Sequence, residues 1–169
     1  MKTTMNIPRR QRSRFDSVNK TFGDFVCMAC HNFVSAEAAL SNVHNRNHCP
    51  YCLSSRHLDL YEAGDRLSAC KAPMKPVGVT LKKTHKKYAW ANRGELMLVH
   101  RCNECGKLSI NRIAADDDVG LVLALFESLP GLDMGTRSAL TRSGIQLVEA
   151  ADKPFVSRQL LGRDQENHR

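Results

Sequence analysis

Four cysteines form the most informative pattern in the sequence. Cys27 with Cys30, and Cys49 with Cys52, are two C-x2-C pairs separated by eighteen residues. A C-x2-C turn lets two sulfurs reach one ion, and Zn(II) favours four thiolates in a tetrahedral arrangement. Two such turns complete a closed shell. The spacing therefore predicts a structural zinc site with no open position for catalysis.

Three further cysteines form a second candidate site. Cys102 and Cys105 are a third C-x2-C pair, and Cys70 stands alone upstream. These thiols can hold a second zinc if a histidine joins them, and we favour His57 over His100 as the fourth ligand. The alternative is that Cys70 is a small core residue, since free cysteines are often buried. One or two Zn(II) ions are therefore expected.

Two other chemistries fit single features of this pattern. Thiol redox enzymes also use C-x-x-C, but they use one pair at the start of a helix, whereas three pairs in this spacing favour metal. A metal-dependent nuclease needs an open coordination position, which a four-thiolate shell lacks. Asp116, Asp117 and Asp118 resemble a magnesium site, although the start of a helix explains their charge. We therefore expect a protein that is not an enzyme.

Basic residues are concentrated in two parts of the chain. Its 169 residues include 25 Lys and Arg against 17 Asp and Glu, which gives a net charge of +8. The clusters are Arg9, Arg10, Arg12 and Arg14 in an N-terminal arm, and Lys82, Lys83, Lys86 and Lys87 before Trp90. Cations neutralise phosphates, and an aromatic face stacks with an unpaired base. Nucleic acid is the expected partner; the alternative is a solvated lysine loop.

The apolar pattern predicts a small zinc-stabilised α+β protein in three segments. Residues 1–21 have the composition of a basic, unpacked arm, residues 22–118 that of a zinc-binding domain, and residues 119–169 that of a helical C-terminal extension. We expect zinc-ribbon-like β-hairpins in the middle segment, with strands over 77–81, 95–100 and 108–113. Gly106 supplies a positive φ in the turn before the last strand.

Helices are expected in the C-terminal extension, where apolar residues recur at helical spacing. Asp116, Asp117 and Asp118 complement the dipole at the first helix N-terminus, and Asp152 with Pro154 marks the start of the last helix. The expected ranges are 119–129, 135–141 and 152–161. These helices are also a candidate docking surface for a protein partner.

Several ordered blocks give the chain a family resemblance. The segment Arg46-Asn47-His48-Cys49-Pro50 resembles the signature after which the RNHCP domain family is named. Matching blocks continue through 25–30, 51–59, 64–66, 100–106 and 111–117, with Cys70, Met74 and Pro76 between them. The similarity covers residues 22–118. It implies a small bacterial zinc-finger-like domain without an established activity.

The resemblance also points to a class of partner. Some family members are fused to a ribosome-associated GTPase domain, which implies ribosomal RNA or small-subunit assembly as the setting. No G-x-x-x-x-G-K-[ST] motif occurs in this sequence, so GTP hydrolysis does not carry over.

The sequence thus predicts a non-enzymatic zinc protein that binds structured, ribosomal RNA. We expect Arg46, His48 and Arg56 on one side, and the Lys82–Lys87 loop with Arg101 on another, to face phosphates. A DNA-binding regulator and a protein-interaction adaptor remain alternatives. Cysteine usage and the lack of an apolar leader predict a cytoplasmic protein, and no apolar run is long enough to span a membrane.

Overall fold

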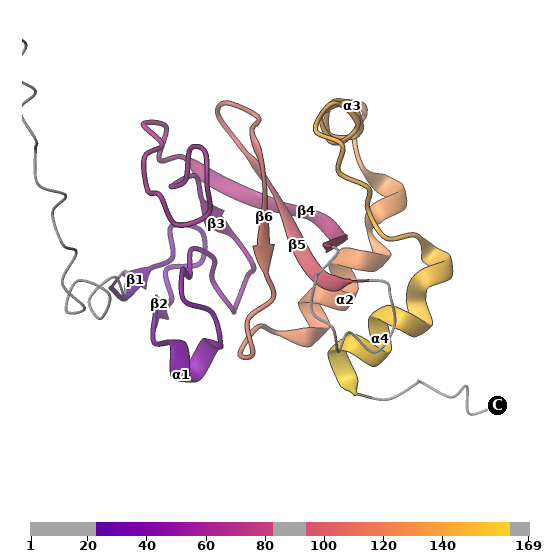
Figure 1. Cartoon of the computed structure of the whole chain (residues 1–169), viewed down its shortest axis with the longest axis horizontal. Helices are drawn as coiled ribbons and strands as arrows, with labels where there is room; N and C mark the ends of the chain where they lie inside the picture. The colour runs from indigo at the N-terminus through magenta and orange to yellow at the C-terminus, as the bar shows by residue number, and fades with distance from the viewer. Residues whose placement is uncertain (1–22, 83–93, 163–169) are drawn as a thin grey trace, which may run out of the picture.

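The computed structural model describes residues 23–82 and 94–162, and these form a small α+β structure with two antiparallel sheets (Figure 1). The first sheet pairs β1 (Phe25–Val26) with β2 (Phe33–Val34). The second contains β3 (Ser55–Arg56), β4 (Pro73–Lys82), β5 (Glu95–Cys102) and β6 (Leu108–Arg112), in that order. The predicted fold class, antiparallel hairpins followed by C-terminal helices, is confirmed.

The long hairpin of β4 and β5 forms the centre of the larger sheet. Its register runs from Met74 opposite Cys102 to Lys82 opposite Glu95. Both strands are longer than predicted. The expected start of β4 came after Pro76, because proline lacks the N–H that a ladder needs. The structure tolerates Pro76 at a bulge, beyond the two residues that pair with β3.

Four helices occur within the described ranges: α1 (Ala38–Ser41), α2 (Val119–Glu127), α3 (Met134–Arg142) and α4 (Lys153–Leu161). Asp118 caps α2 by accepting a hydrogen bond from the Leu121 N–H, and Asp133 caps α3 in the same way. Pro154 lies in the first turn of α4, and Gly162 ends that helix with a φ of 71°. The three C-terminal helices agree with the prediction to within a few residues.

The main hydrophobic core joins the sheet to the C-terminal helices. Leu53, Val79, Leu96 and Leu98 pack with Val122, Phe126, Val148 and Val156, all of them buried. In Figure 1, α2 and α4 lie together beside β4 and β5. Gly78 permits close packing here, because a Cβ at this position would lie 2.8 Å from Leu129 Cδ2. Residues on both sides of position 118 therefore share one core.

None of the helices in the described ranges is long and apolar enough to cross a membrane.

Candidate metal centres

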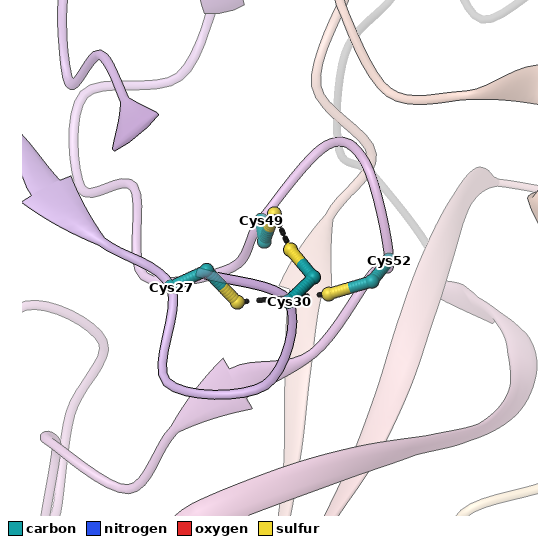
Figure 2. Close-up of side chains that lie close together, drawn as sticks. All are labelled: Cys27, Cys30, Cys49 and Cys52. Atoms are coloured by element: carbon teal, nitrogen blue, oxygen red, sulfur yellow. Dashed lines mark hydrogen bonds between the residues drawn. The ribbon is translucent and has the colours of Figure 1, made fainter. Parts of the chain in front are cut away.

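The first group of ligands brings together the two cysteine pairs that the spacing predicts to bind one ion (Figure 2). The Sγ atoms of Cys27 and Cys52 are 3.6 Å apart, and those of Cys30 and Cys49 are 3.5 Å apart. A tetrahedral ion with Zn–S bonds of about 2.3 Å has sulfur–sulfur edges of about 3.8 Å, whereas a disulfide is about 2.05 Å long. The spacing of the four thiols fits a zinc ion and excludes a disulfide.

The same backbone turn carries all three C-x2-C pairs. In each turn the first cysteine donates its N–H to the carbonyl five residues later and accepts a bond from the N–H four residues later. That fourth residue has a positive φ: 61° at His31, 58° at Leu53 and 72° at Gly106. The sequence signals only Gly106, because His31 and Leu53 are not residue types that favour this conformation.

The second group consists of His57, Cys70, Cys102 and Cys105, whose ligand atoms lie within 4.8 Å of one another. Cys105 Sγ is 3.3 Å from His57 Nδ1, and Cys70 Sγ is 3.7 Å from Cys102 Sγ. Burial, and then the charge of Lys107, lowers the pKa of His57. The imidazole is therefore neutral near pH 7 and has a lone pair for a metal.

The donor chemistry of both groups fits Zn(II). Seven sulfurs and one imidazole nitrogen form closed sets of four, which is typical of structural zinc and leaves no position for a water or a substrate. Protein N–H groups also point at the sulfurs, as from Ala29 to Cys27 at 3.4 Å. The Asn32 N–H lowers the pKa of Cys30 to about 6, while burial raises that of Cys49. The chain is a zinc-binding protein with room for one or two ions.

The two centres differ in exposure. Cys27 and Cys49 in the first group are buried, and Cys30 and Cys52 are half-buried. In the second group Cys102 is buried, whereas Cys70 and Cys105 are exposed. Cys70 is therefore not the core residue of the alternative interpretation.

The signature segment supports the fold instead of facing solvent. Arg46 is only 2% exposed; its Nη1 donates to both Asp116 carboxylate oxygens at 2.7 and 2.8 Å, and its Nε donates to the His48 carbonyl. His48, also 2% exposed, places Nε2 2.9 Å from the carboxylate of buried Asp117. The prediction that Arg46 and His48 face phosphates is wrong, because these carboxylates already occupy both side chains.

Asp116 and Asp117 consequently have a different role from the predicted one. Only Asp118 caps α2. Asp117 also accepts the Ala114 N–H at 2.8 Å, so it joins the second knuckle to the turn before α2. No sequence pattern identifies these contacts, because the paired residues are about seventy positions apart.

His100, the alternative zinc ligand, lies in the core between other partners. It is fully buried, its Nε2 donates to the Leu53 carbonyl at 2.7 Å, and Asn111 Nδ2 donates to its Nδ1 at 2.8 Å. Burial and the neighbouring His48 lower its pKa to about 3, so the ring is neutral. The structure places His57, and not His100, beside the three thiols.

The predicted RNA contacts fall into separate places. Arg56 and Lys82 are exposed, and Arg101 is half-buried. Arg101 pairs with Lys75 near the zinc end of the hairpin, whereas Lys82 pairs with Glu95 at the other end. Six residues of β5 span about 20 Å, so Arg101 does not share a surface with Lys82 as predicted. The other predicted contacts, Arg9, Arg10, Arg12, Arg14, Lys83, Lys86, Lys87 and Trp90, lie outside the described residues.

Comparison with known proteins identifies one family. The family model described as the RNHCP domain matches residues 22–123, which include both candidate zinc centres and the signature segment. No curated protein and no solved structure matches the chain.

Proposed function

Since the chain belongs to the RNHCP domain family and carries two zinc-binding groups, we propose that it is a non-enzymatic protein that binds structured, ribosomal RNA. The closed ligand sets support a structural role for the metal, because neither group leaves a coordination position for a reacting molecule. The ribosomal target follows from the family resemblance, and the RNA from the distribution of charge.

The observation that carries the proposal is the position of the lysine cluster on the sheet. Lys82 is the last residue of β4 and pairs with Glu95, the first residue of β5. The connection between them carries Lys83, Lys86 and Lys87, so the cluster belongs to one end of the hairpin. The other end contains Cys102 and the second zinc centre. A hairpin anchored by metal and core is a stable base for phosphate contacts.

Cations close to the zinc centres have another task. A zinc ion with four thiolates carries a net charge of −2, and one with three thiolates and an imidazole carries −1. Lys107 and Lys71 lie near enough to His57 to lower its pKa. Lys107 donates to the Leu60 carbonyl and Lys71 to the Arg66 carbonyl. These lysines offset the charge of the second centre, so phosphate binding falls to the hairpin cluster and the N-terminal arm.

The test is purification of the native chain at low and high salt, with zinc analysis and sequencing of any RNA that accompanies it through a density gradient. The proposal expects ribosomal RNA at low salt and its loss at high salt, because phosphate contacts weaken as counterions compete. An absence of RNA at low salt from the zinc-loaded protein would contradict it. A competing DNA duplex that displaces the RNA at equal concentration would favour a DNA-binding regulator.

A second candidate function is a protein adaptor, and one observation favours it. The C-terminal helices surround a hollow of about 750 Å³ lined by apolar side chains that include Phe126, Leu129 and Ile145. A partner that remains bound after nuclease treatment would support this candidate.

A further inference from the structure

A hollow of about 330 Å³ lies beside the first zinc knuckle. The knuckle forms one wall and the segment around β3 forms the opposite wall. Its volume is at the lower end of the range of about 300–1,000 Å³ typical of small-ligand sites. The hollow lies outside both metal-ligand groups, although Cys27 contributes to its wall.

The walls of the hollow are largely apolar. Phe25, Val26, Met28, Leu58 and Pro73 contribute to the lining. Val26 is 60% exposed and Met28 is 53% exposed, so large apolar side chains face solvent beside a cavity. Zinc coordination by Cys27 and Cys30 fixes the turn that carries Met28. This wall is therefore preorganised, and it does not need to order on binding.

The charged groups at the hollow are cationic. Arg56 and Arg66 line it, and none of its described lining residues is Asp or Glu apart from the enclosed Arg46 pair partners, which lie elsewhere. Arg56 is exposed and donates only through Nε, to the Lys71 carbonyl at 2.9 Å, among the described contacts. Its Nη groups are positioned to bind an anion. Gly23 also lines the hollow, and the arginine-rich arm joins the chain directly before it.

We propose that this hollow is a nucleobase pocket, which takes one unpaired base of a single-stranded RNA segment while Arg56 binds the adjacent phosphate. The inference rests on the proposed RNA-binding function and adds the subsite that would hold a base. An apolar wall with an aromatic ring accepts the face of any base, and arginine supplies the phosphate contact. The basic arm extends this contact to neighbouring phosphates.

A peptide fits the same site less well. Strand addition needs a free edge of several residues, whereas β1 and β3 have two residues each. The hollow is also too small for a helix, which needs a groove that accepts anchors over several turns. A peptide would therefore place a single side chain in this site.

The test compares Met28→Asp with Met134→Asp in the full-length, zinc-loaded protein. Met134 is 78% exposed on α3 and does not line the hollow, so it is a matched control for the same substitution. The probes are a labelled single-stranded RNA dodecamer and an abasic dodecamer with the same number of phosphates. Zinc content and the melting temperature establish that each variant is folded.

The pocket predicts that wild type and Met134→Asp bind the RNA about tenfold more tightly than the abasic strand, as stacking of a base implies. Met28→Asp should bind both strands with equal, weaker affinity. In a 4-thiouridine strand, crosslinks should map to the peptide that contains Met28. Equal RNA affinity of wild type and Met28→Asp would overturn the pocket while RNA binding stands.

The remaining outcomes are also decisive. No binding of either strand by wild type would overturn the proposed function together with the pocket. If Met28→Asp loses its zinc, Arg56→Gln is measured instead, and unchanged discrimination with unchanged affinity overturns the pocket. Capture of an acidic apolar peptide by wild type but not by Met28→Asp, with RNA binding unaffected, would assign the hollow to a peptide and overturn the proposal.

Discussion

Arg46 Nη1 lies 2.7 Å from the carboxylate of Asp116, a residue seventy positions later in the chain. Nη2 of the same guanidinium is 3.5 Å from Asp117, which His48 also contacts. These contacts join the second zinc knuckle to the segment that starts α2. The residues that name the family therefore connect its metal-binding part to the helical part of the core.

Replacement of Arg46 by Met should destabilise the protein by about 3–5 kcal/mol, because Asp117 would remain buried without its compensating charge. Urea unfolding of the zinc-loaded protein measures this loss. Arg46→Lys should not restore stability, since an ammonium cannot make the same set of contacts as a guanidinium. Arg56→Met, at an exposed position, is the control. A stable Arg46→Met protein with weakened RNA binding would return Arg46 to the RNA interface.

His57→Ala should reduce the zinc content from two ions per chain to one, because it removes the nitrogen ligand beside Cys105. His57→Cys should retain both ions, since it restores a fourth soft donor. His100→Gln is the informative comparison: it should lower stability but leave both ions bound. Mass spectrometry of the native protein gives the stoichiometry. Loss of zinc from the His100 variant, with none from His57→Ala, would reverse the assignment.

A chelator should remove the ion of the second centre first, because Cys70 and Cys105 are exposed while Cys27 and Cys49 are buried. Zinc release followed with a colorimetric chelator should show two phases. Alkylation at the end of the fast phase should modify Cys70, Cys102 and Cys105 and spare the first group. Simultaneous release with uniform alkylation would mean that both centres open together on unfolding.

Replacement of Lys82, Lys83, Lys86 and Lys87 by Ala should weaken RNA binding and flatten its dependence on salt. Each lost phosphate contact lowers the slope of log K against log salt by about 0.7 on a single strand, so four contacts lower it by about 3. Arg142→Ala with Lys153→Ala, at exposed positions of α3 and α4, is the control for net charge. An equal effect per charge in both variants would remove the lysine cluster from the interface.

Phe126→Ala should cost about 3–5 kcal/mol, since its buried side chain packs α2 against the sheet. Leu121→Ala, at a 38% exposed position on the same helix, should have a small effect. Circular dichroism during thermal unfolding measures both. If Phe126→Ala melts in two transitions, with the zinc-binding part unchanged, the helices form a separate unit and not part of one core.

Much of the fold and the metal chemistry can be predicted from the sequence, because both depend on local patterns. C-x2-C pairs mark the knuckles, alternating apolar residues mark β5, and capping residues such as Asp118 mark the helix starts. The grouping of His57 with Cys70 needs the tertiary structure, since two residues far apart on the chain meet only after β4 and β5 pair.

Charge is the feature that sequence reasoning interpreted least well. Arg46 and His48 resemble surface cations in the sequence, and their acidic partners resemble a helix terminus. Their pairing depends on the long-range packing of the knuckle against the turn before α2, which leaves no periodic signal. Clusters without nearby acids, such as the lysines after residue 81, remain the better indicator of a phosphate-binding surface.

The central claim is that seven sulfurs and one nitrogen hold two zinc ions. X-ray absorption at the zinc edge, combined with metal analysis of the native full-length chain, tests it most directly. The account predicts two ions per chain with Zn–S distances of about 2.3 Å and a minor nitrogen shell near 2.0 Å. One ion per chain, or a coordination shell dominated by oxygen and nitrogen, would contradict it.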